Sequence, residues 1–422
     1  MIEVKLRRVF WAWHFWTGLI AAPVLIILSI TGALYVFKPE IEVWWYDEIA
    51  SAEFDIQTDS LNDCVTAAMR SVGEGYGLYG LEIEHGTGRA PAVLAMANDG
   101  SHQIRRIYVD PRQNRVLGEI PEPNFFTVVL AIHRRLLAGT PGRVLTELTT
   151  GWTIAITLIG IILWWPRSWR RLSGILVPRL SGKRYVQLRD LHSIGGTAIS
   201  SIVIVISITG LLYALVWGGL FQVTGFLSGQ FDVVLDPPQS LSDTSQDKIS
   251  VDDVVTRLRE LSLPTARVSI AMGQIESDPI TIESGQHWGP SVTRLVHLDR
   301  RSGEILANQR LSNLPPMAIY TQWNYPLHVG SIAGLTTKII WIVAAIGLAL
   351  LPILGIAMWL TRRRPGKTGV PKRTEAVHPG WLKAIIALLA ISLPTVGLSM
   401  LAVAAVGWYR QHRQNRSNSL SG

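Results

Sequence analysis

The sequence has a single cysteine and few charged residues. Of its 422 residues, 17% are charged and 48% are hydrophobic, and the mean hydropathy is +0.27. Because Cys64 has no partner cysteine, an intramolecular disulfide, a thiolate metal cluster and a covalently attached c-type haem are all excluded. The chain has one Gly-x-Gly-x-x-Gly segment, Gly75 to Gly80, but it follows the helical pattern of residues 59–72 and not a strand, so it does not indicate a bound dinucleotide. This composition is typical of a membrane protein.

The net charge of +8 does not point to nucleic acid. Basic residues lie beside apolar runs, as the positive-inside rule expects of a protein whose partner is the lipid bilayer. The segment 167–190 carries seven basic residues and one acid, which places it in the cytoplasm. The N-terminus, on the other side of one apolar run from the first polar domain, is then also cytoplasmic.

The hydropathy pattern predicts a membrane α-helical bundle that carries two small α+β domains on the periplasmic side. Its core is four spanning helices from a duplicated unit, followed by a fifth, C-terminal helix. In chain order we expect a spanning helix at 1–37, a polar domain at 38–123, an interfacial helix at 124–142, a spanning helix at 143–166, a basic cytoplasmic loop at 167–190, a spanning helix at 191–217, a second polar domain at 218–318, an interfacial segment at 319–337, a spanning helix at 338–361, a basic cytoplasmic loop at 362–380, a spanning helix at 381–408 and a tail at 409–422.

The duplication is visible as a repeated motif. Two histidines, His14 and His192, are each followed after four residues by a glycine and after seventeen by the threonine of a Ser-Ile-Thr-Gly segment. A second pair, His133 and His328, each precede a glycine by six residues and a tryptophan by 31. Four of the ten histidines therefore occupy matched places at the ends of predicted spanning helices.

Matched histidines across a helical bundle suggest haem. His14 and His192 are expected at one depth near the cytoplasmic boundary, and His133 and His328 at the opposite face. Each pair can supply both axial ligands of one b-type haem, which gives two haems. Gly18 and Gly196 share a helix face with the histidine four residues earlier and leave room for a flat ligand. The cations Arg8, Arg189, Arg134 and Arg135 are candidates for pairing with haem propionates, although they also suit ordinary basic flanks of membrane helices.

These features resemble a known family. The paired histidine and Ser-Ile-Thr-Gly patterns, together with the turns Asp110 to Asn114 and Asp299 to Gly303, are similar to the PepSY-associated transmembrane proteins of Gram-negative bacteria over about residues 5–365. The resemblance implies an inner-membrane protein with periplasmic PepSY-like domains. Some members of that family reduce ferric siderophores with two bis-histidine haems, and their ligands match His14, His133, His192 and His328. The fifth helix departs from the four-helix pattern.

The function expected from this resemblance is an oxidoreductase that passes electrons across the membrane to a periplasmic ferric siderophore or another ferric chelate. The donor would be a reduced flavin, a quinol or a reductase. Trp323 and Tyr325 are candidates for touching the substrate. Two alternatives stay open: a haem-free scaffold whose polar domains bind peptide or regulate a protease, and a haem protein with a quinone, copper or another small oxidant as acceptor.

Overall fold

The computed structural model divides the chain into two compact units. The membrane unit comprises Met1–Val36, Val129–Gln222 and Ile339–Gly422, and the sheet unit comprises Phe37–Val128 and Val223–Lys338. The structure describes residues 2–56, 58–166, 173–231, 237–240, 248–273, 275, 277–363, 366–371 and 379–419. Parts of the predicted cytoplasmic loops and tail, at 167–172, 364–365, 372–378 and 420–422, lie outside these residues.

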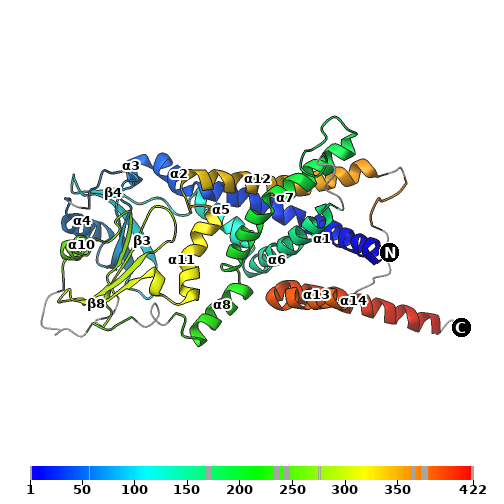
Figure 1. Ribbon diagram of the computed structural model, residues 1–422. Helices are drawn as coiled ribbons and strands as arrows, with labels where there is room; N and C mark the ends of the chain where they lie inside the picture. Colours follow the sequence, from blue (N-terminus) through cyan, green and yellow to red (C-terminus); the bar gives the residue numbers. More distant parts are fainter. Residues whose placement is uncertain are drawn as a thin grey trace. The chain divides into compact units, whose positions relative to one another are not determined.

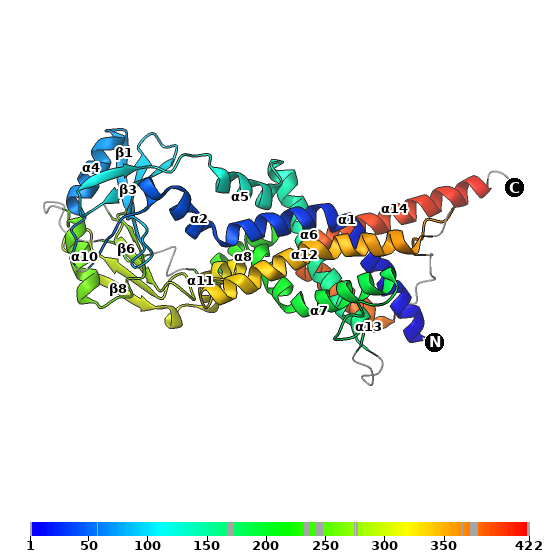
Figure 2. The ribbon, with the colours of Figure 1, turned by 90° about the horizontal axis from the view of Figure 1, so that it is seen from above.

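Four long helices dominate the membrane unit: α1 (Ile2–Val36), α6 (Gly139–Trp164), α7 (Arg184–Leu211) and α12 (Leu335–Arg362). Within the described residues these four are long and apolar enough to cross a bilayer. The shortest has 26 residues, about 39 Å at 1.5 Å per residue, which exceeds a hydrocarbon core of ~30 Å. Helix α6 packs against both α1 and α7 (Figures 1 and 2). The prediction of a membrane protein with four core helices is confirmed.

Two helix boundaries differ from the prediction. The helix predicted at 191–217 ends at Leu211, and a short turn separates it from α8 (Val216–Leu227). The spanning helix predicted to begin at 143 begins at Gly139, and the chain reverses at Leu136 and Leu137, whose φ angles are 50° and 56°. Gly142 serves close packing, because a Cβ there would lie 1.8 Å from the Arg135 carbonyl oxygen.

The prediction of one continuous fifth helix at 381–408 is wrong. The chain forms two apolar helices, α13 (Gly380–Ser392) and α14 (Pro394–Ser419), which meet at Leu393. Proline has no backbone N–H to continue the helix, so α13 stops before Pro394. Helix α14 packs on α6, where the Trp152 indole donates to Ser399 Oγ over 3.2 Å.

The sheet unit contains one eight-stranded antiparallel sheet in the order β4-β3-β2-β1-β5-β6-β7-β8. The strands are β1 (Tyr76–Ile83), β2 (Ala92–Ala97), β3 (Ile104–Asp110), β4 (Arg115–Gly118), β5 (Arg267–Ala271), β6 (Ile280–Gly285), β7 (Arg294–Leu298) and β8 (Ile305–Arg310). Strand β1 pairs with β5, and a Cβ at Gly80 in this pair would lie 2.1 Å from the Ile270 carbonyl oxygen. The two predicted polar domains are therefore not separate, because this pairing joins them into one sheet.

Helices cover one face of this sheet. α4 (Asn62–Val72) and α10 (Val251–Glu260) lie side by side, and their apolar faces share one buried cluster with the strands (Figure 2). The Asp252 carboxylate links the two helix starts by accepting the backbone N–H of Leu61 over 2.8 Å. The remaining helices are α2 (Lys38–Trp45), α3 (Asp47–Ala50), α5 (Phe125–Arg135), the 3₁₀ helix η1 (Leu311–Asn313) and α11 (Pro316–Val329).

Candidate functional site

The structure brings two of the predicted histidines together inside the membrane unit. His14 on α1 and His192 on α7 have ring centroids 6.0 Å apart, and their ring planes are perpendicular at 90°. They are 178 positions apart in the sequence. The approach follows from the packing of α1 and α7 against the same neighbour, α6.

Each ring is oriented by a backbone carbonyl of a facing helix. His14 Nδ1 lies 3.1 Å from the Ile156 carbonyl oxygen on α6, and His192 Nδ1 lies 2.9 Å from the Leu351 carbonyl oxygen on α12. A carbonyl oxygen can only accept, so Nδ1 carries the proton in both rings. The other nitrogen, Nε2, is then the one with a lone pair for a ligand.

Both rings line a cavity of about 770 Å³ among α1, α6, α7 and α12. This volume lies in the range of cofactor sites, ~300–1,000 Å³. Gly18 and Gly196 form part of its wall, as the motif predicted, and a Cβ added to Gly18 would meet nothing within 4 Å. A Cβ at Gly196 would contact the Leu351 side chain at 3.5 Å. The remaining wall is mostly apolar and aromatic, including Leu19, Leu25, Ile199, Val203, Leu348 and Trp359.

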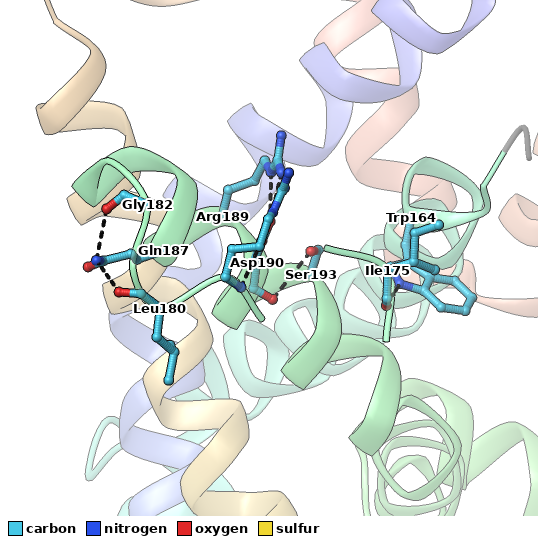
Figure 3. A network of polar contacts seen from close by, with 9 residues as sticks. Trp164, Ile175, Leu180, Gly182, Gln187, Arg189, Asp190 and Ser193 are labelled. Carbon is cyan, nitrogen blue, oxygen red and sulfur yellow. Dashed lines mark hydrogen bonds and ion pairs between the residues drawn. The ribbon is translucent and has the colours of Figure 1, made fainter. Parts of the chain in front are cut away.

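Cationic side chains also line this cavity: Arg7, Arg8 and Arg189. Arg189 is held by its neighbour Asp190, with Nη2 2.7 Å from Oδ1, and Asp190 also accepts from Arg179 Nε over 2.7 Å (Figure 3). The Asp190 carboxylate is fully buried, whereas both guanidinium groups are partly exposed. This network anchors the start of α7 just before His192.

The chain between α6 and α7 is held by further hydrogen bonds. The Trp164 indole donates to the Ile175 carbonyl over 3.0 Å, and the Gln187 amide donates to the carbonyls of Leu180 and Gly182 (Figure 3). Trp164 itself lines the cavity. Residues 173–190 of the predicted cytoplasmic loop are therefore tied to the cavity wall.

His133, at the end of α5, is held by the Ser-Ile-Thr-Gly motif of α1. The Thr31 hydroxyl donates to the Ile27 carbonyl over 2.7 Å, so its oxygen can accept from His133 Nδ1 at 2.9 Å. The Leu28 carbonyl is a second acceptor for this ring. The adjacent Arg134 lies 6.0 Å from the centre of the Tyr213 ring.

His328 lies in the last turn of α11, in the sheet unit. Its predicted pairing with His133, which belongs to the membrane unit, stays a prediction.

The sheet unit has a smaller polar cleft of about 170 Å³ that the sequence pattern does not predict. Glu42 is buried in it, 3.4 Å from Lys38 Nζ and 3.5 Å from Arg89 Nη2. Of the two aromatic residues predicted to touch substrate, Tyr325 lines this cleft, whereas Trp323 lies beside Gly289. No local sequence pattern predicts the cleft, because its charged residues come from separate helix, strand and loop segments.

Four long apolar helices around a histidine-lined cavity, with an antiparallel sheet unit, define a membrane protein of the multi-helix type. The model of the family described as the PepSY-associated TM region matches residues 11–362, and the chain belongs to that family. The resemblance inferred from the repeated motifs is therefore confirmed. No curated protein sequence matches the chain.

Proposed function

We propose that this protein is an inner-membrane electron-transfer protein with two b-type haems that reduces a periplasmic ferric complex such as a ferric siderophore. His14 and His192 would ligate one haem, and His133 and His328 the other. Electrons would come from the cytoplasmic or membrane side. The observation that carries the proposal is the pair of neighbouring imidazoles, His14 and His192, in a cofactor-sized cavity among the spanning helices.

The spacing of the two rings fits a haem iron. Two iron–nitrogen bonds of about 2 Å, plus about 1 Å from each Nε2 to its ring centre, place the centroids of two opposed imidazoles roughly 6 Å apart. The observed separation is 6.0 Å. A bare metal ion fits less well, because among the described residues no group of three or more His, Cys, Asp or Glu side chains could hold one.

The surrounding residues supply what a bound haem requires. When bound, a haem with two imidazole ligands would supply one-electron transfer with no open iron position. The carbonyls of Ile156 and Leu351 orient the rings and make Nε2 more basic, as partners of metal-ligating histidines do. Arg8 and Arg189 at the cavity wall offer charge-assisted hydrogen bonds to propionates. The apolar wall excludes water.

The proposed substrate follows from redox chemistry and from the family. Hard oxygen ligands, such as hydroxamates and catecholates, suit Fe(III) better than Fe(II), so one-electron reduction weakens the complex and releases the metal. The cleft of the sheet unit is lined by Tyr325, by the cations Lys38, Arg89 and Arg106, and by the acids Glu42, Glu82 and Glu84. Glu42 and Glu82 pair with these cations, so the charge of the cleft does not by itself select an anionic chelate. The one Gly-x-Gly-x-x-Gly segment, Gly75 to Gly80, runs into strand β1 and does not open a helix, so it does not form a dinucleotide site. The donor would be a separate reduced flavin, quinol or reductase.

Haem quantification tests the proposal. We expect two haems per chain, with paired α and β bands after dithionite reduction, in purified full-length protein. His14→Ala or His192→Ala should each remove one haem, and His133→Ala or His328→Ala the other. Control variants at His102 and His287, histidines outside the two matched pairs, should keep both haems.

Two results would contradict the proposal. A flat visible baseline in the wild type would favour the haem-free scaffold that binds peptide or regulates a protease. Equal haem loss from the control variants would argue that the four histidines are not the ligands. If haem is present but ferric chelates do not oxidise the reduced protein, another acceptor such as a quinone or copper should be tested.

A further inference from the structure

Three of the predicted ligand histidines sit in the same kind of backbone notch, which consists of a helix carbonyl at position i and a glycine at i+4. His14 lies against the Ile156 carbonyl with Gly160 beside it, and His192 against the Leu351 carbonyl with Gly355 beside it. His133 lies against the Leu28 carbonyl with Gly32 beside it.

The shared spacing has a physical reason. In an α-helix the carbonyl of residue i already accepts the N–H of residue i+4, so a second donor must reach its other lone pair from the side. The side chain at i+4 stands next to that path, and a glycine leaves the path open. Glycine is unfavourable inside a helix, so three helical glycines at these positions call for such a reason.

We propose that Gly160, Gly355 and Gly32 are positioning residues that let each imidazole reach its carbonyl and so set the direction of Nε2. The inference deepens the haem function proposed above and rests on it. Gly160 and Gly355 each lie four residues before the matched tryptophans Trp164 and Trp359, so they occupy equivalent places in the predicted repeat. These glycines have no side chain with which to contact a haem. They would act by setting the positions of the histidine rings.

The same reasoning gives the Ser-Ile-Thr-Gly motif a role in its first copy. Gly32 opens the space for the His133 ring, and Thr31 adds a second acceptor for Nδ1 at 2.9 Å. His133 therefore has two acceptors, a carbonyl and a hydroxyl, whereas His14 and His192 each lie against a backbone carbonyl.

The distances predict a graded response to added methyl groups. A Cβ at Gly160 would lie 3.2 Å from His14 Cε1, and one at Gly32 would lie 3.2 Å from His133 Cε1. Both are tighter than ordinary contacts, so the ring must shift by a few tenths of an ångström. A Cβ at Gly355 would lie 3.6 Å from His192 Cε1, an ordinary van der Waals contact. Alanine at position 355 should thus leave the His192 ring in place, whereas alanine at position 160 or 32 should displace the neighbouring histidine ring.

The experiment compares Gly160→Ala, Gly32→Ala, Gly355→Ala and Gly355→Leu in purified full-length protein. Gly195→Ala is the matched control, because a Cβ at this α7 glycine meets nothing within 4 Å. Readouts are haem per chain, the low-spin EPR signal of the oxidised protein and the midpoint potentials. The EPR signal reports the angle between the two imidazole planes, which is 90° for His14 and His192. A change in helix stability alone would not change this angle.

We expect wild-type spectra from Gly195→Ala and Gly355→Ala. Gly160→Ala should alter the EPR signal and potential of one haem, Gly32→Ala those of the other, and Gly355→Leu should lose one haem. If the wild type has both haems but Gly160→Ala and Gly32→Ala match Gly195→Ala, the notch inference fails while the haem function stands. If the wild type has no haem, both fail. Should an alanine variant not fold, the contrast between Gly355→Ala and Gly355→Leu decides the question, and equal behaviour refutes the inference.

Discussion

Removing the Asp190 carboxylate should weaken the membrane unit and loosen the cavity at its cationic edge. This carboxylate accepts five hydrogen bonds: from Arg179 N at 3.2 Å, Nε at 2.7 Å and Nη2 at 3.0 Å, and from Arg189 Nε at 3.1 Å and Nη2 at 2.7 Å. It is fully buried two residues before His192. Asp190→Ala removes all five contacts, whereas Asp190→Asn keeps the shape and one acceptor oxygen.

The size of the effect follows from burial on one side and exposure on the other. Breaking a fully buried ion pair costs about 3–5 kcal/mol. The Arg179 and Arg189 side chains are 41% and 43% exposed, so water can solvate them once the carboxylate is gone, and the cost is reduced. We expect the free energy of unfolding to fall by about 2–3 kcal/mol in Asp190→Ala and by ~1–2 kcal/mol in Asp190→Asn.

Thermal unfolding in detergent, followed by size-exclusion chromatography, measures this loss. The midpoint should fall by roughly 5–10 °C in Asp190→Ala, and less in Asp190→Asn. Under the proposed function, haem retention should fall in parallel, because Arg189 is no longer held at the cavity wall. Arg184→Gln, at an exposed position of the same helix, is the control. A midpoint unchanged in Asp190→Ala, or lowered equally in Arg184→Gln, would refute the reasoning.

Two further predictions concern the Glu147 carboxylate and the Cys64 thiol. Glu147 on α6 accepts the N–H groups of Val216 at 2.8 Å and Trp217 at 3.1 Å, the first two residues of α8. Glu147→Ala should therefore lower the free energy of unfolding by ~1–3 kcal/mol, and Glu147→Gln by less, in the same thermal assay; equal losses would contradict the capping role. Burial raises the pKa of the Cys64 thiol from 9.0 to about 11, so only the unfolded thiol ionises between these values, and stability should fall by about 1.4 kcal/mol per pH unit there. Denaturant titrations of wild type and Cys64→Ala at pH 8 and pH 10.5 check the sign, and an equal pH dependence in both would count against it.

Much of the membrane unit can be predicted from the local sequence. Four apolar runs of sufficient length predict four spanning helices, because transfer into the bilayer depends on composition within one segment. The histidine spacing marked His14 and His192 as partners, and the structure places their rings together. Average hydropathy does not register the missing backbone N–H of Pro394, so it does not predict the helix break at Leu393.

Only the tertiary structure decided which distant backbones meet. The pairing of β1 with β5, which unites two predicted domains, depends on the approach of Gly80 to Ile270 and not on either segment alone. Likewise, nothing in the residue types of Ile156 and Leu351 predicts that their carbonyls accept from histidine rings. Every residue carries the same carbonyl group, so side-chain patterns can nominate a ligand, but helix packing alone selects the backbone atom that orients it.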